Sequence, residues 1–294
     1  LEPFSPDPDV YLNGRENFFA FGLKALERLA GRVVVAVPAR KNTRRAALSK
    51  VLGDARLKPV GGVYPALDPG VVVYHTKTDA EENRSWFLDG QDVVMLGELL
   101  LSGKFPVHRI MTVAGTMARQ RRHVKTRIGV PLADLAGSAG LLTGDCRHVV
   151  GGLLTGFKSG PAGFMGFYED ALNLIPEGAH REFLSLFRPG YRKPSYSRAF
   201  LSVLNRGPLI ADTNIHGELR ACIGCNHCPP VCPVEILPQL TYKCVLADDV
   251  DGALAHGLLD CVECGLCSYV CPAKIDLAGA LKEARRTYRE EGQR

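Results

Sequence analysis

The sequence predicts the fold class α/β plus α, in which two front domains that contain strands precede an all-helical C-terminal domain. Three observations lead to this prediction. Residues 1–106 alternate helix-like and strand-like segments, residues 107–166 hold short strands separated by glycines, and residues 216–294 carry two cysteine runs within helix-like sequence. Alternating helices and strands are typical of α/β domains, because the helices cover the faces of a sheet.

The first region opens with a helix expected over Asn17–Ala30 and ended by the glycine that follows. The apolar residues on one face of this helix are Phe18, Phe21, Ala25 and Leu29. Arg32–Val37 is rich in β-branched residues, as in a strand covered on both faces. Thr43 can cap a helix over Arg44–Leu52.

The rest of this region continues the alternation. Val71–Tyr74 is a second candidate for a buried strand, and Asp89 can cap a helix over Gln91–Leu101 that Gly103 closes. The region contains neither a G-x-G-x-x-G sequence nor a P-loop sequence. We therefore find no nucleotide-binding fingerprint.

Residues 107–166 indicate a small β-rich domain. Pro131 stands where a short helix over Leu132–Ala136 can begin. Residues 167–215 are mixed and contain turn signals at Pro176–Gly178 and Pro189–Gly190. The strands expected in the β-rich domain are Arg109–Ala114, His123–Thr126 and Arg147–Val150.

The strongest signal is a duplicated C-x2-C-x2-C-x3-C-P run, which is the spacing of bacterial two-cluster ferredoxins. The first three cysteines of each run can wrap one [4Fe–4S] cluster, and the fourth is directed toward the other cluster. The sequence therefore predicts two [4Fe–4S] clusters. Their expected ligands are Cys222, Cys225, Cys228 and Cys271 for the first cluster, and Cys261, Cys264, Cys267 and Cys232 for the second.

Structural zinc is the alternative reading of these cysteines. Zinc needs four ligands, so two C-x2-C pairs would be enough. Each run instead supplies four cysteines, and proline follows the fourth both times. The repeated spacing favours iron–sulfur clusters over zinc.

The sequence between and after the runs looks helical. Val234–Leu246 carries a helical apolar pattern, and Asp248 or Asp249 can cap a helix through Ala253–Leu259. Asp276 can cap a terminal helix that has Leu277 and Leu281 on one face. An all-helical domain fits this pattern better than a β-rich ferredoxin.

Composition narrows the class of protein. The formal net charge of +5 falls to about +1 once two clusters with a charge of −2 each are counted, so it is not a nucleic-acid signal. No apolar run approaches the roughly 18–20 residues that span a bilayer. No basic segment precedes an apolar one at the start, so we do not expect secretion.

Other candidate residues lie outside the ligand positions. Cys146 and Cys244 are interpreted as small buried apolar residues. His227 either tunes the cluster potential or faces solvent, and the sequence leaves both open. A basic stretch can dock an acidic partner or anionic lipid, although a solvated strand and turn is the favoured reading. Its residues are Arg119, Arg121, Arg122, His123, Lys125 and Arg127.

A series of short segments matches a known family in order: His108–Gly115, Thr126–Gly129, Pro176–Gly178, Phe187–Gly190, Ser197–Leu201, Ile236–Pro238, Asp251–Ala253, Gly257–Leu259 and Val270–Pro272. These segments resemble NqrA, a subunit family of the sodium-translocating NADH:quinone reductase (Nqr). The similarity runs from about Trp86 to the C-terminus and is looser before it. The usual NqrA lacks the cluster cysteines, and the complete double run instead resembles the RnfC subunit of the related Rnf complex.

This resemblance implies four regions. They are a partial flavoprotein-like α/β domain at 1–106, a β-grasp domain of the soluble-ligand-binding (SLBB) type at 107–166, a connecting segment at 167–215 and a helical ferredoxin domain at 216–294. Both families place more sequence before the α/β region than this chain has, and the sequence leaves open whether that domain is N-terminally truncated. In RnfC the missing part binds flavin and NADH, so we expect neither FMN nor NADH on this chain.

The resemblance also implies an iron–sulfur electron-transfer subunit of an Nqr/Rnf-type membrane-bound NADH:quinone or ferredoxin:NAD oxidoreductase. Such a protein is peripheral on the cytoplasmic face of the inner membrane and binds other subunits, with quinone as a further candidate partner. We expect no catalytic residue, because outer-sphere electron transfer needs no acid, base or nucleophile. Two alternatives stay open: a free-standing carrier, as in heterodisulfide-reductase-like modules, and a non-redox scaffold with structural metal.

Overall fold

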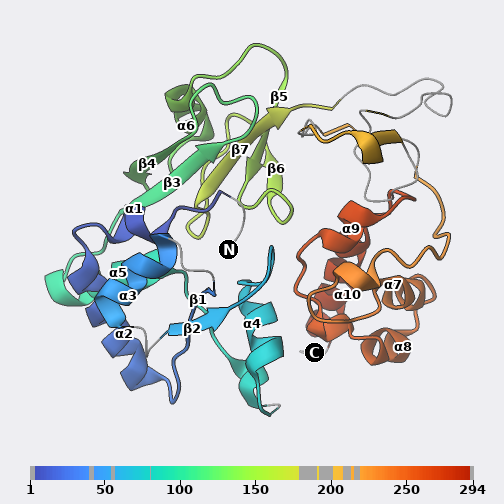
Figure 1. Ribbon diagram of the computed structural model, residues 1–294, viewed down its shortest axis with the longest axis horizontal. Helices are drawn as coiled ribbons and strands as arrows, with labels where there is room; N and C mark the ends of the chain where they lie inside the picture. The colour runs from blue at the N-terminus through green and yellow to red at the C-terminus, as the bar shows by residue number, and fades with distance from the viewer. Residues whose placement is uncertain are drawn as a thin grey trace. The chain divides into compact units, whose positions relative to one another are not determined.

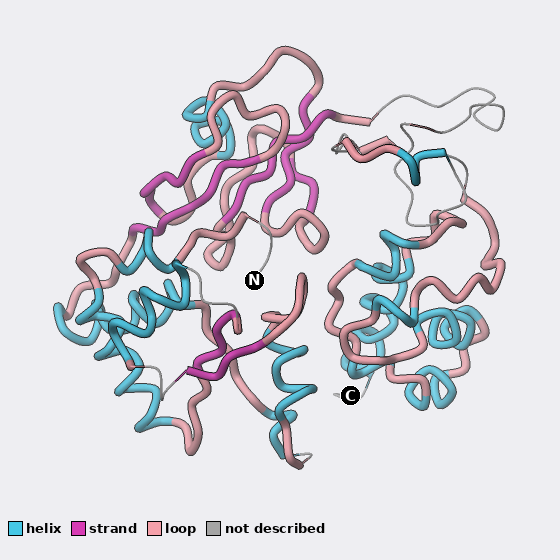
Figure 2. The backbone as a smooth tube through the Cα atoms, in the orientation of Figure 1, coloured by secondary structure: helices cyan, strands magenta, loops and turns pink. Residues whose placement is uncertain are grey.

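The computed structural model describes residues 4–39, 43–53, 57–79, 81–178, 191, 201–207, 213–214 and 219–291. The chain forms two compact units, one of residues 1–143 with 147–174 and one of residues 144–146 with 175–294. Each unit is described by itself (Figures 1 and 2). Much of the connecting segment predicted at 167–215 lies outside the described residues, and so does the matching segment Phe187–Gly190.

The first unit begins with the predicted alternation of helices and strands (Figure 1). Strands β1 and β2 pair in parallel and α3 connects them, which forms a βαβ unit. The elements are α1 (Pro8–Leu12), α2 (Glu16–Leu29), β1 (Val35–Pro38), α3 (Thr43–Leu52), β2 (Leu57–Val60), α4 (Pro69–Thr76), the 3₁₀ helix η2 (Glu81–Arg84) and α5 (Gly90–Ser102).

Helices α2 and α5 approach each other closely through glycines. A Cβ atom at Gly97 would lie 1.8 Å from the carbonyl oxygen of Phe18, and one at Gly22 would lie 2.2 Å from that of Val93. Because of this contact, α2 buries Phe19 and Leu23 in the core. Phe21 and Leu29, which belong to the apolar face predicted from the sequence, are exposed. The pattern of large apolar residues therefore did not predict which face of α2 is buried, because glycines make the contact.

The Val71–Tyr74 strand prediction was wrong, since these residues lie within helix α4. Asp68 caps α4 by accepting hydrogen bonds from the backbone N–H groups of Gly70 and Val71, and Pro69 stands at the first helical position. A short β-branched run does not distinguish a strand from a buried helix. The Asp89 cap of α5 and its closure at Gly103 are confirmed.

The β-rich part forms a five-stranded sheet with the order β4-β3-β7-β5-β6. The central pair β3 and β7 is parallel, whereas β3 with β4 and β5 with β6 are antiparallel. Helix α6 (Leu132–Ala139) begins after Pro131, as predicted. The sheet extends past residue 166, because β7 is one of its strands. The strands are β3 (His108–Ala114), β4 (Arg122–Arg127), β5 (Cys146–Val150), β6 (Phe157–Ser159) and β7 (Ala171–Pro176).

A buried cation in β3 has several carboxylates around it. The side chain of Arg109 is only 1% exposed, and its Nη1 donates to Asp92 at 2.5 Å. Asp89, Glu169 and Asp170 are close enough for Arg109 to lower their pKa values, yet burial leaves all three pKa values raised. For Asp170 the pKa is raised to about 7, mainly by burial and then by Asp89.

Residues 219–291 of the second unit consist of helices and loops (Figure 2). Asp249 caps α8 and accepts a hydrogen bond from Gly252 N–H, and Asp276 accepts one from Gly279 N–H at the start of α10. The prediction of an all-helical domain is therefore confirmed for residues 219–291. The elements of this unit are η4 (Leu201–Leu204), η5 (Pro229–Val231), α7 (Pro238–Leu246), α8 (Val250–Ala255), η6 (Leu258–Asp260), α9 (Leu266–Val270) and α10 (Leu277–Glu291).

Within the described residues, no helix is both long enough and apolar enough to cross a membrane.

Candidate iron–sulfur centres

The two cysteine loops have the same backbone shape. The residue before the second cysteine and the residue after it both have positive φ, in Gly224 and Asn226 of the first loop. Their counterparts 39 residues later, Glu263 and Gly265, have positive φ as well. Such left-handed residues reverse the chain sharply and allow three cysteines to line one concave loop.

The duplication continues past the fourth cysteine of each run. Glu235 and Lys274 each stand three residues after that cysteine, and both have positive φ. Buried Ile236 and Ile275 follow them at matching positions. The two halves therefore share their fold from the cysteine loop to the start of the next helix.

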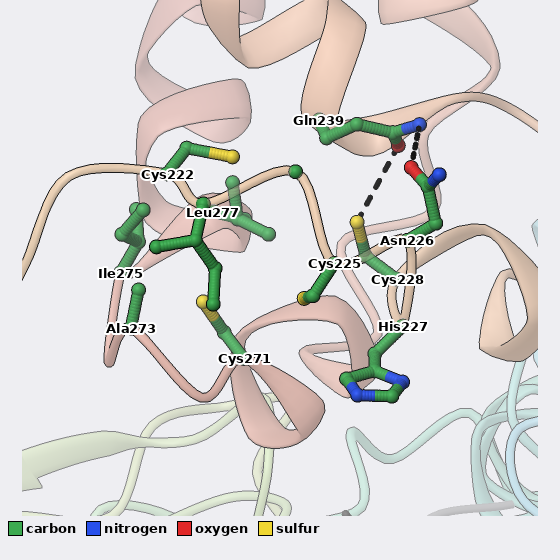
Figure 3. A pocket seen from close by; sticks show the side chains of 12 residues that line it. Cys222, Cys225, Asn226, His227, Cys228, Gln239, Cys271, Ala273, Ile275 and Leu277 are labelled. Atoms are coloured by element: carbon green, nitrogen blue, oxygen red, sulfur yellow. Dashed lines mark hydrogen bonds between the residues drawn. The ribbon is translucent and has the colours of Figure 1, made fainter.

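Each loop borders a pocket that is completed by the other half of the domain. The first pocket is lined by Cys222, Cys225 and Cys228 together with Cys271. In Figure 3 the four sulfurs border one space, and the His227 ring points away from them. The second pocket is lined by Cys261, Cys264 and Cys267 together with Cys232. This is the same grouping as in the ligand assignment made from the sequence.

The pockets suit a group wider than a single ion. Among the described residues, no three His, Cys, Asp or Glu side chains are grouped closely enough to hold one metal ion. A single zinc ion would need all its sulfurs about 2.3 Å from one point. The four cysteines of the first pocket are spread around its lining and are not gathered at one point (Figure 3). Four thiolates around such a space can each bind a different metal atom.

Burial holds several of these thiols in the neutral form when no metal is bound. Desolvation raises the pKa of Cys228 and of Cys261. Burial, followed by the neighbouring Cys261 and Cys264, raises the pKa of Cys267 to about 12. A bound metal takes the place of these protons, because cysteine binds metal as a thiolate. A cationic iron–sulfur core would therefore stabilise the deprotonated form of these cysteines.

A charged network supports the second loop. Arg285 of α10 donates to the carbonyl oxygen of Cys261 and pairs with Glu263. Lys282 lies 3.3 Å from the same carboxylate. Helix α10 thus holds the strained, non-glycine Glu263 in its left-handed conformation and brings a cation close to Cys261.

The first pocket has a neutral network instead. The Sγ–H of Cys228 donates to Oε1 of Gln239 at 3.4 Å, and Nε2 of Gln239 donates to Oδ1 of Asn226 at 3.3 Å (Figure 3). Gln239 is only 9% exposed. The sequence analysis did not identify Gln239, although comparing the two halves at the 39-residue offset would have shown that this amide stands opposite Ala278.

The remaining candidates lie elsewhere. Cys146 and Cys244 are half-buried and line neither of these two pockets. The basic side chains of the 119–127 stretch are exposed on the turn and on the edge strand β4, as the reading of a solvated strand predicts. His123 contacts Thr112, with 2.9 Å between Nδ1 and Oγ1.

Fold and site together define a class of protein in which an α/β region is joined to a helical iron–sulfur domain. Family models bear this out: residues 1–105 match the NqrA second alpha/beta domain, and residues 215–285 match the 4Fe-4S dicluster domain. The resemblance recognised in the sequence is thereby confirmed.

The relatives specify which protein of that class the chain is similar to, namely the NqrA subunit of Na(+)-translocating NADH-quinone reductase. The chain is 31% identical to the NqrA of Shewanella amazonensis and 30% identical to that of Vibrio atlanticus, in each case over 99% of this chain and 65% of the relative. The NqrA of Rhodopirellula baltica is 30% identical over 99% of this chain and 64% of the relative. The chain thus spans slightly less than two thirds of the length of these relatives.

Proposed function

We propose that this chain is an iron–sulfur electron-transfer subunit of an Nqr/Rnf-type membrane oxidoreductase, which relays single electrons through two [4Fe–4S] clusters. The observation that carries the proposal is the lining of the two pockets. Each holds three cysteines of one run and the fourth cysteine of the other. The match to a 4Fe-4S dicluster domain and the likeness to the NqrA of an NADH-quinone reductase support the same reading.

The residues have simple roles in this proposal. Bound clusters supply one-electron redox chemistry. Cys222, Cys225, Cys228 and Cys271 hold the first cluster, and Cys261, Cys264, Cys267 and Cys232 hold the second. Apolar residues such as Ile275 and Leu281 line the pockets and limit access of water, and no acid, base or nucleophile takes part.

The domain organisation supports docking within a larger complex. The sheet order β4-β3-β7-β5-β6 with a parallel central pair fits the β-grasp domain expected from residue 107. We assign to the two front domains the contacts with other subunits, on the cytoplasmic face of the membrane. Quinone is a candidate partner, and the proposal places no FMN or NADH site on this chain.

The first experiment measures iron and sulfide in anaerobically purified chain, where two clusters give about eight of each per chain. Electron paramagnetic resonance after dithionite reduction should show two interacting clusters. Cys271→Ser should remove one cluster, whereas the matched change Cys244→Ser should leave both. Zinc in place of iron would refute the proposal in favour of a metal-stabilised scaffold.

The second experiment tests the complex. The native protein should co-purify with hydrophobic subunits in the membrane fraction. If it carries both clusters but elutes alone from a salt-free soluble fraction, it is instead a free-standing carrier between a dehydrogenase and another acceptor.

A further inference from the structure

The two pockets differ in one polar group. Gln239 lines the first pocket from the first turn of α7, and its counterpart 39 residues later, Ala278, lines the second pocket from the first turn of α10. Asn226, which positions the Gln239 amide, likewise corresponds to Gly265. The hydrogen-bonded pair of amides in the first half is thus replaced by two residues without polar side chains in the second.

Loading a cluster reverses the direction of this hydrogen-bond chain. In the metal-free protein the Cys228 thiol donates to Oε1 of Gln239. A cysteine that ligates iron is a thiolate, which can only accept. Gln239 would otherwise turn an oxygen toward an anion at a buried position, so its amide must present Nε2–H to the sulfur instead. Asn226 can follow by turning its own amide and donating to Oε1 of Gln239.

We infer that Gln239 is a positioning residue that donates a hydrogen bond to the Cys228 thiolate and raises the reduction potential of the first cluster above the value its ligands alone would give. The inference rests on the proposed clusters. A donor to a ligand sulfur stabilises the reduced state, which carries one more negative charge. The second pocket has Ala278 at the matching position and gains no such bond from it.

The nearby charges do not explain this difference by themselves. Around the second pocket Arg285 and Lys282 face Glu263, so two cations and one anion act there together. The potentials of the two clusters therefore cannot be compared directly to isolate the amide. The effect of the amide is isolated by substituting Gln239 in the first pocket and, as a control, the corresponding Ala278 in the second.

The experiment uses the full chain with both clusters loaded anaerobically, and redox titration followed by electron paramagnetic resonance. Gln239→Leu should lower one midpoint potential and leave the other in place. The expected loss is about tenfold in the equilibrium constant for reduction, which is 59 mV for a one-electron couple. Gln239→Glu should lower the same midpoint further, because a carboxylate adds negative charge and no donor. The matched control, Ala278→Leu, should leave that midpoint unchanged.

A purely structural role would give a different result. If Gln239 only braces the loop, Gln239→Leu lowers the melting temperature while both midpoints and the Fe–S stretching frequencies in resonance Raman spectra stay as they were, which overturns the inference. If Gln239→Leu fails to load, Asn226→Gly serves in its place, since Gly265 shows that glycine suits this backbone. It should lower the same midpoint by a smaller amount, and an unchanged midpoint again overturns the inference. If the wild-type chain contains no iron, the proposed function itself is refuted, and this result is distinct from a failure of the inference about Gln239.

Discussion

In the first compact unit the core is made of ordinary apolar side chains such as Leu12, Phe19 and Val94, whereas the core of the second unit includes cysteines. There Cys228 is buried with Val270 and Ile275, and Cys222, Cys267 and Cys271 pack against them. The first unit therefore buries its apolar surface without help. The second unit has cysteines, the proposed cluster ligands, at core positions where leucine and valine would be usual.

This difference says where each unit gets its stability. Burying an aliphatic side chain contributes about 1.5–3 kcal/mol, whatever else is bound. Thiols around a pocket contribute fully only when something fills the pocket, because binding to the native state alone adds directly to its stability. We expect the second unit to depend on its cofactors and the first unit not to.

The largest effect should follow removal of the clusters. Treating the full chain with an oxidant and a chelator should unfold much of the second unit, because its core then has empty pockets lined by thiols. Hydrogen exchange should show lost protection in α7, α9 and α10 and kept protection in α2 and α5. Equal loss of protection in both units would contradict the comparison.

Gly97→Ala should have the next largest effect, in the first unit only. Helix propensity alone favours alanine by about 1 kcal/mol. The new Cβ would meet the carbonyl oxygen of Phe18 at 1.8 Å, and overpacking of this kind costs typically 1–3 kcal/mol or more. We expect a lower unfolding midpoint of this unit and unchanged cluster spectra.

Gly137→Ala is the matched control, because nothing lies within 4 Å of its Cβ position in α6. It should stabilise the unit by up to about 1 kcal/mol. If Gly97→Ala also stabilised it, the close contact of α2 with α5 would be refuted.

Asp170 should make the stability of the first unit depend on pH. Its pKa is raised from an ordinary 3.8 to about 7, mainly by burial. The folded state therefore holds a proton that the unfolded chain has lost, so stability falls as pH rises from about 4 to about 7 and is level above that. Asp170→Asn should remove this decline and add on the order of 1–2 kcal/mol above pH 7. Calorimetry between pH 5 and 8 measures this stability as a function of pH. If the stability of the wild type and of Asp170→Asn changes with pH in parallel, Asp170 is ionised throughout and the prediction is wrong.

The smallest effect should come from Asp276→Ala at the start of α10. Asp276 Oδ1 accepts from Gly279 N–H and from the Ser268 hydroxyl, both at 3.0 Å. Loss of such a cap costs about 1 kcal/mol. In the loaded protein we expect faster cluster loss to a chelator but normal spectra. Asp249→Ala, which removes the cap of α8, should change that rate less, because α8 lines neither pocket.

Features that depend on residues close together in the sequence could be predicted, whereas features that depend on distant residues could not. The caps Asp89 and Asp276 were predictable, because a cap acts within a few residues of its own helix. The buried face of α2 was not, since it depends on a glycine in α5 that is distant in the sequence. The Arg109 group was not predictable either, because its carboxylates come from two segments, 89–92 and 169–170, that are separate from Arg109 in the sequence.

The site followed the same rule. The grouping of the cysteines could be predicted from their spacing, because the fourth cysteine of such a run is directed away from its own loop and toward the other cluster. Gln239 gave no local signal, because one buried amide in a helix is ordinary until the pocket beside it is known. The middle strand of the sheet, β7, was likewise not predicted, because it lies in a segment that the sequence showed only as mixed.

Helix α10 begins between the two pockets. Leu277 lines the first, and its neighbours Ala278 and Leu281 line the second. One helical turn rises about 5.4 Å, so these three residues lie within little more than one turn of each other. If both pockets hold the proposed clusters, this short stretch of helix sets the distance that an electron must cross between them. We then expect a constant rate for that transfer, while docking and release of partners change only the first and last electron transfers.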